Sequence, residues 1–82
     1  KVKPNQAILQ VSGDAKAVLS CERTVLNLLA RMSGIATQTS LLVSKIRKIN
    51  RKTKLYSTRK TAPGLRFFDK EAVAIGGGHK HR

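Results

Sequence analysis

The stretch TRKTAPG, residues 58–64, follows a short run of extended character, residues 54–57, and precedes an apolar-periodic run, residues 65–75. This order predicts a strand, a loop and a helix. Pro63 suits the first position of a helix, because its missing N–H group would have no partner there. In α/β folds, ligands bind at loops that leave the carboxyl ends of strands, so residues 58–64 are the first place to expect a site.

This loop carries two adjacent cations, Arg59 and Lys60, between two hydroxyls, Thr58 and Thr61. Arg offers a planar fork of donors, and Lys offers a compact point charge. The free N–H groups and the dipole at the start of the following helix would add to the attraction for an anion. The sequence therefore predicts an anion-binding loop, and a solvated basic turn is the equally weighted alternative.

The rest of the chain predicts an α/β fold class. We expect five elements in the order strand, helix, helix, strand, helix, over residues 7–11, 15–32, 35–49, 54–57 and 65–75. Asp14 is the expected N-cap of the first helix, Ser33 and Gly34 should end or kink it, and the glycines at 76–78 should stop the last helix. The final β-loop-α unit resembles one turn of an α/β barrel, which one unit cannot close.

The charge of the chain is unusual for an enzyme. Its 82 residues include 17 Lys and Arg against four Asp and Glu, a formal net charge of +13, and no acid lies between Glu22 and Asp69. Two explanations compete: the chain binds nucleic acid, or it is a segment of a larger protein whose acids lie elsewhere. The basic run at 45–54 lacks interleaved aromatics for base stacking, so a solvated helix end is the favoured interpretation of that run.

Targeting features point to a cytoplasmic protein. No apolar run is long enough for a membrane span, and the first residues do not follow the pattern of a secretory signal. The single cysteine, Cys21, excludes an internal disulfide and suits a reducing compartment.

Two further groups of residues are candidates for chemistry. Arg23 lies on a polar stripe of the first helix, which either lines a site or interface or simply contacts solvent. His79 and His81 make a poor metal-ligand set, because no carboxylate accompanies them. A neutral donor from His81 next to Arg82 suits an anionic ligand better.

Three motifs in the same order carry a family resemblance. Residues 22–37, ERTVLNLLARMSGIAT, resemble the ERTxLNxLxRxSGIAT signature of quinolinate phosphoribosyltransferases. Residues 58–66, TRKTAPGLR, resemble the TRKTxPGxR loop of that family. Residues 70–82 resemble its EKxAVxxGGGxxHR segment, with Asp69 in the place of the usual acid. The resemblance covers residues 8–82.

The resemblance implies a position within a larger fold. Residues 1–34 would be the end of an N-terminal α/β sandwich domain with its long helix, and residues 35–82 would be the second helix and the start of an incomplete α/β barrel domain. We expect these 82 residues alone to be inactive and poorly folded.

The resemblance also implies an activity in de novo NAD biosynthesis. Such enzymes transfer a phosphoribosyl group from phosphoribosyl pyrophosphate to the ring nitrogen of quinolinate, and they form nicotinate mononucleotide, pyrophosphate and CO2. Mg²⁺ would accompany the pyrophosphate donor, with its ligands beyond Arg82. The expected assembly is a homodimer or a multiple of dimers, without a membrane or a specific nucleic acid as partner.

By motif position, the resemblance implies roles for several cations. Arg59, Lys60, His81 and Arg82 would bind the carboxylates of quinolinate and the donor phosphates, with Thr58 and Thr61 supporting the loop. Arg23 would reach the site of a partner subunit. No catalytic nucleophile is assigned, since substitution at a sugar carbon depends on positioning and electrostatic stabilisation.

Two alternatives stay open. One is a relative on the same scaffold, either a nicotinate phosphoribosyltransferase or a molybdenum-associated pyrophosphorylase-like protein. The other is a small basic domain that binds nucleic acid or another polyanion, for which binding would depend steeply on salt.

Overall fold

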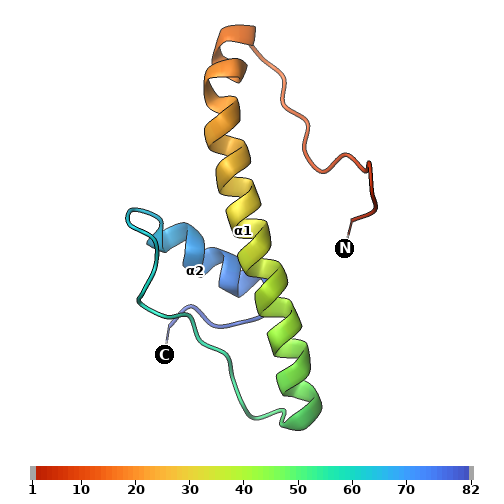
Figure 1. The fold of residues 1–82 in the computed structure, drawn as a ribbon, viewed down its shortest axis with the longest axis vertical. Coiled ribbons are helices and arrows are strands. Elements are labelled where there is room, and N and C mark those ends of the chain that lie inside the picture. Colours follow the sequence, from red (N-terminus) through yellow and green to blue (C-terminus); the bar gives the residue numbers. More distant parts are fainter. Residues whose placement is uncertain (1, 82) are drawn as a thin grey trace.

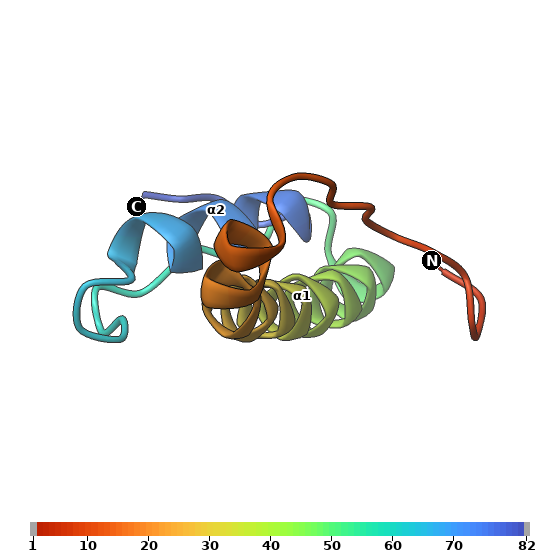
Figure 2. The same ribbon diagram turned by 90° about the horizontal axis from the view of Figure 1, so that it is seen from above.

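Two helices of unequal length organise the chain. The computed structural model describes residues 2–81. Helix α1 spans Ala15–Ile49 and helix α2 spans Arg66–Ile75. Helix α2 packs beside the middle of α1, and the segment before α1 runs back along the first turns of that helix (Figure 1). The molecule is flat, measuring 50 × 31 × 13 Å, and the view along α1 shows α2 on one side of it (Figure 2).

The expected break at Ser33 and Gly34 is wrong, because α1 is one continuous helix of 35 residues. The apolar stripe explains this result. Half-buried or buried side chains recur every three or four residues on both sides of residue 34, at Leu29, Met32, Ala36, Thr39, Val43 and Ile46. Gly in a helix interior costs about 1 kcal/mol relative to Ala, and one uninterrupted packing face outweighs that cost. The predicted N-cap is confirmed, since Asp14 accepts a hydrogen bond from the Ala17 N–H at 3.4 Å.

The two expected strands are largely absent from residues 2–81. Residues 7–11 pair with no other described segment, and residues 54–57 form only one parallel bridge, between Tyr56 and His79. A strand is stable only beside partners, and this bridge has a single pairing segment. The bridge still has the connectivity of a β-α-β unit, because two parallel segments are joined through α2. The only sign of the expected α/β class among the described residues is therefore this one bridge with its connecting helix. The expected barrel is not tested by these residues.

The turn before α2 corrects the expected role of Pro63. Helix α2 begins at Arg66, so Pro63 is not at its first position. The Leu65 N–H donates to the Ala62 carbonyl at 3.0 Å, and Gly64 has a φ of 75°. Pro at the second position and Gly with positive φ at the third position are the features of a type II turn. The helix ends at Ile75, followed by Gly76, as the sequence predicts.

The contact between the helices is close and depends on small residues. Ala72 is fully buried and Thr39 of α1 is 6% exposed. A Cβ atom on Gly76 would lie 2.4 Å from the Ala36 carbonyl oxygen and 2.8 Å from the Thr39 Cβ. The backbone after α2 thus touches α1 directly, and only glycine fits at this point.

Most large apolar side chains of the chain are exposed. Ala72 is the buried apolar residue among those described, and the first half of α1 with the preceding segment leaves an apolar groove open. Leu19, Leu26, Ile8 and Leu9 are among the exposed side chains. The described residues therefore hold one small contact region rather than a full core. None of the described helices combines the length and apolarity that crossing a bilayer requires.

Substituting Gly76→Ala should destabilise the protein that contains these residues by about 1–3 kcal/mol, because the added methyl group collides with α1 backbone. Gly34→Ala is the matched control, since its Cβ would meet nothing within 4 Å. That control should be neutral or stabilising by up to about 1 kcal/mol. Chemical unfolding of both variants measures the difference. Equal stabilities would contradict the close helix contact.

Candidate anion-binding site

A basic pocket of about 340 Å³ lies where the loop, α2 and the C-terminal segment meet. Its described lining residues are Ser57, Arg59, Arg66, Lys70 and His81. Three of the five side chains are cations, one is an imidazole and one is a hydroxyl. No acidic side chain belongs to this lining, so the pocket presents donors and positive charge to whatever enters it.

The parallel bridge explains why distant residues meet at this pocket. The Ser57 N–H donates to the His79 carbonyl at 2.8 Å, and the His79 N–H donates to the Leu55 carbonyl at 2.9 Å. Arg59 lies two residues after Ser57, and His81 lies two residues after His79. Because the segments run parallel, both side chains leave the bridge toward the same end. This is the carboxyl end, where α/β folds place their ligands.

Helix α2 supplies the other two cations. Arg66 and Lys70 are four residues apart, so they share one helix face. The Lys70 ammonium donates to the Lys80 carbonyl at 2.8 Å, which fixes its position beside the C-terminal segment. Lys80 in turn pairs with Glu71 on the surface. One helix face and one loop thus converge on the pocket.

Local hydrogen bonds shape the loop itself. The Lys60 N–H donates to the Thr58 hydroxyl at 3.1 Å, and the Thr61 N–H donates to the Arg59 carbonyl at 3.0 Å. A Thr hydroxyl that accepts from the backbone two residues later is a common way to tighten a turn. Thr58 therefore acts through the backbone, while the two cations keep their side chains free of described ion pairs.

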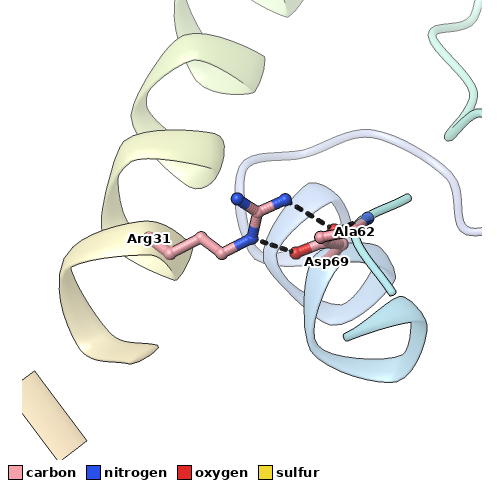
Figure 3. A network of polar contacts seen from close by, with 3 residues as sticks. All are labelled: Arg31, Ala62 and Asp69. Atoms are coloured by element: carbon pink, nitrogen blue, oxygen red, sulfur yellow. Dashed lines mark hydrogen bonds and ion pairs between the residues drawn. The ribbon is translucent and has the colours of Figure 1, made fainter. Parts of the chain in front are cut away.

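A carboxylate anchors the loop at Ala62 (Figure 3). The Arg31 Nε donates to Asp69 Oδ1 at 2.8 Å, and the Arg31 Nη2 donates to Asp69 Oδ2 at 2.9 Å. The Ala62 N–H donates to the same Oδ2 at 3.2 Å. The hydrogen bonds from Arg31, followed by the one from Ala62, hold the pKa of Asp69 below its usual value against the opposing effect of burial. The same bonding raises the pKa of Arg31.

The structure brings together some of the residues that the sequence singles out. Arg59 and His81 line the pocket, whereas Lys60 and Thr61 belong to the loop beside it without lining it. Arg23 is exposed on α1 and does not line it either. Arg82 lies outside the described residues. The binding roles of all these residues remain predictions.

Sequence reasoning missed Arg66 and Lys70 as pocket residues, and it gave no role to Arg31. Arg66 and Lys70 both fall within the quoted motifs, and their spacing of four residues on a helix was available as a signal. Only the packing of α2 beside the loop shows that both side chains face the pocket. Arg31 resembled one more cation of a polar stripe.

Metal ligands are not gathered in the described part of the chain. No three His, Cys, Asp or Glu side chains among residues 2–81 come close enough to hold an ion. The pocket lining is cationic, and hard divalent cations prefer carboxylate and other oxygen ligands. These residues therefore do not fit Mg²⁺ directly.

Protein-family models match almost the whole chain. The model for the quinolinate phosphoribosyl transferase C-terminal domain matches residues 35–82. The model for the N-terminal domain of the same family matches residues 1–33. The division of the chain into domains at residues 34 and 35 stays a prediction.

Several individual relatives are named as carboxylating nicotinate-nucleotide pyrophosphorylases. The chain is 46% identical over 99% of its length to a probable carboxylating nicotinate-nucleotide pyrophosphorylase of Archaeoglobus fulgidus, of which it covers 31%. It is 46% identical over its full length to the corresponding Mycobacterium leprae protein, of which it covers 28%. A crystal structure of NadC from Streptococcus pyogenes matches 85% of the chain with a TM-score of 0.71 at 44% identity, over 24% of that protein. The chain spans less than a third of these relatives.

Acid should weaken the link between Asp69 and Arg31. Because the folded pKa of Asp69 is depressed, its contribution to stability is fully present above the unfolded pKa of about 3.9 and is lost as pH falls through the lower folded value. The difference in unfolding free energy between wild type and Asp69→Asn should therefore be constant above about pH 5 and shrink below about pH 4. Urea unfolding across this range measures it. Asp14→Asn is the control, because Asp14 makes no ion pair with a described residue and Asn caps a helix about as well as Asp does. A difference for Asp69→Asn that grows in acid would contradict the assignment.

Proposed function

Because the chain belongs to the quinolinate phosphoribosyl transferase family, we propose that the full-length protein transfers a phosphoribosyl group to quinolinate. The donor is phosphoribosyl pyrophosphate, and the products are nicotinate mononucleotide, pyrophosphate and CO2. The observation that carries the proposal is the basic pocket beside the TRKTAPG loop, in a chain that both domain models of the family match.

The charge of the pocket suits these substrates. Quinolinate is a dicarboxylate, and the donor carries a monophosphate and a pyrophosphate. Arg59 and Arg66 offer planar forks that match carboxylate or phosphate oxygens, and Lys70 adds a point charge. His81 can donate a hydrogen bond through a ring N–H. Few other small-molecule classes would need so many cations in one pocket.

The pocket contributes to the reaction by positioning and electrostatics. Substitution at the sugar carbon passes through an oxocarbenium-like state while negative charge builds up on the departing pyrophosphate. Cations held in fixed places stabilise that charge without reorganising. The same cations would align the ring nitrogen of quinolinate with the sugar carbon, which lowers the entropic part of the barrier. No side chain of this chain has to act as a nucleophile.

Mg²⁺ is proposed to arrive with the pyrophosphate group. The described residues do not offer it a ligand set, and its protein ligands are proposed to lie outside them. The residues of this chain would act only on the organic and phosphate groups.

Arg23 is proposed to serve the site of a partner subunit in a homodimer. Its side chain is exposed on α1, makes no ion pair with a described residue and does not line the pocket of its own chain. These features are expected of an arginine whose anionic partner is bound in the site of a second subunit. A shared site would also make dimerisation a requirement for activity.

A cytoplasmic location is proposed from the free, exposed Cys21, which suits a reducing compartment. Location varies among relatives, because the protein of Arabidopsis thaliana bears the word chloroplastic in its name.

The first experiment supplies the full-length protein with phosphoribosyl pyrophosphate, Mg²⁺ and either quinolinate or nicotinate. We expect nicotinate mononucleotide and CO2 from quinolinate, and no turnover of nicotinate. Arg59→Ala should lower kcat/KM for quinolinate about 10- to 100-fold, the range for loss of a charge-assisted hydrogen-bonding group.

Lys48→Ala is the matched control, because Lys48 is an exposed cation in the last turn of α1 and does not line the Arg59 pocket. It removes the same charge without touching the loop, so its kcat/KM should stay within about twofold of wild type. Turnover of nicotinate instead of quinolinate would favour the related nicotinate phosphoribosyltransferase. Equal losses of kcat/KM in both variants would mean that the net charge of the protein, and not the pocket, attracts the substrates.

Mixing of two impaired variants tests the shared site. Arg23→Ala and Arg59→Ala should each impair homodimers, whereas co-expressed subunits should form hybrids in which one site lacks both substitutions. Random pairing would restore about a quarter of the wild-type activity. Activity of the mixture that stays at the mean of the two variants would place Arg23 outside the partner's site.

A further inference from the structure

The Asp69 carboxylate links three parts of the chain. It belongs to the first turn of α2, its two oxygens receive the Arg31 guanidinium from α1, and one of them also receives the Ala62 N–H from the loop (Figure 3). None of these three residues lines the basic pocket. We propose that Asp69, held by Arg31, is a positioning residue for the anion-binding loop, an inference that rests on the proposed function.

The hydrogen bonds occupy three of the roughly four acceptor sites of this carboxylate, so it has little capacity left to bind the loop cations. Both oxygens accept from the fork of Arg31 at 2.8 and 2.9 Å, and Oδ2 accepts from the backbone as well. An unpaired carboxylate beside the loop would compete with an anionic substrate for Arg59 and Lys60. Asp69 avoids this competition, because an arginine outside the pocket satisfies it. The loop is therefore anchored without losing its positive charge.

Burial makes the anchor rigid. Asp69 is 6% exposed, so leaving its partners would strand a charge away from water. Ala62 lies only two residues after Lys60. Between them, the hydrogen bond from the Thr61 N–H to the Arg59 carbonyl tightens the backbone that joins Arg59 to Ala62. A shift of Ala62 would therefore pass directly to both cations.

The same residue sets the second half of the pocket. Asp69 precedes Lys70 and lies three residues after Arg66 on α2. Fixing Asp69 against both Arg31 and Ala62 thus fixes the helix cations relative to the loop cation. A pocket that aligns a dicarboxylate with a pyrophosphate needs this relative position, since misplacement of about 1 Å can cost up to about 100-fold in rate.

The test compares two ways of removing the anchor in the full-length protein. Asp69→Asn keeps the shape but loses the charge that holds Arg31. We expect KM for quinolinate to rise about tenfold or more. Amide hydrogen exchange in a peptide covering residues 58–64 should become faster, because Ala62 loses its charged acceptor.

The double variant Arg31→Met with Asp69→Leu separates positioning from stability. Asp69 is buried while Arg31 is partly exposed, and an apolar pair often replaces the buried part of an ion pair without loss of stability. Leu cannot accept from the Ala62 N–H, however. We therefore expect the melting temperature to recover toward wild type while KM stays raised and exchange in residues 58–64 stays fast.

Asp14→Asn is the control, since it removes a carboxylate at the start of α1, keeps a good N-cap residue, does not touch the pocket, and should change neither KM nor exchange. The proposal is overturned if the double variant recovers KM together with the melting temperature, or if Asp69→Asn leaves KM within twofold and exchange unchanged. If the wild-type protein forms no nicotinate mononucleotide, the proposed function is wrong, which is a different result from the two above. The exchange data would still decide whether Asp69 positions the loop.

Discussion

The close contact of α2 with the middle of α1 is the constraint on which the rest of the structure depends. Its apolar half includes the buried residues Ala72 of α2 and Thr39 of α1, with Gly76 close to the α1 backbone. Its polar half is the bidentate pair of Arg31 and Asp69. The apolar half sets how near the helices come, and the polar half sets the position of α2 along α1. Once α2 is placed, the pocket residues that it carries are placed as well.

Local signals in the sequence predicted the ends of helices better than their continuity. Asp14 caps α1, and α2 stops before the glycines at 76–78, because caps and stops depend on neighbouring residues only. The break at Gly34 was wrong because a local cost competes with packing along the whole helix. Strands at 7–11 and 54–57 depend on partners that a local pattern does not specify. The prediction of Pro63 at the start of a helix is wrong because Pro suits the second position of a type II turn equally well.

The residues of the candidate site also fall into those that a local sequence pattern predicts and those that only the packing of the helices reveals. Arg59 is indicated because a pair of cations follows an extended run, and His81 because it lies in the last two positions of a motif of the family. The side chains of Arg66 and Lys70 cannot be assigned to the pocket from the sequence, since a helix face points to a site only once a neighbouring segment is placed beside it. Arg31 and Asp69 lie 38 residues apart, and nothing local relates them. The family itself was recognisable from three motifs, which the family models confirm.

The continuity of α1 has a mechanical consequence. The two family-model matches end at residue 33 and begin again at residue 35, inside this helix. A helix is far stiffer in torsion than a glycine-rich linker, so the parts on either side of residue 34 cannot swivel freely about each other. Arg23 on one side and Thr39 on the other are therefore held about 24 Å apart along one axis and at a set angle around it. A rotation that moved one of them would have to turn the other by the same amount, as with two marks on one rigid shaft.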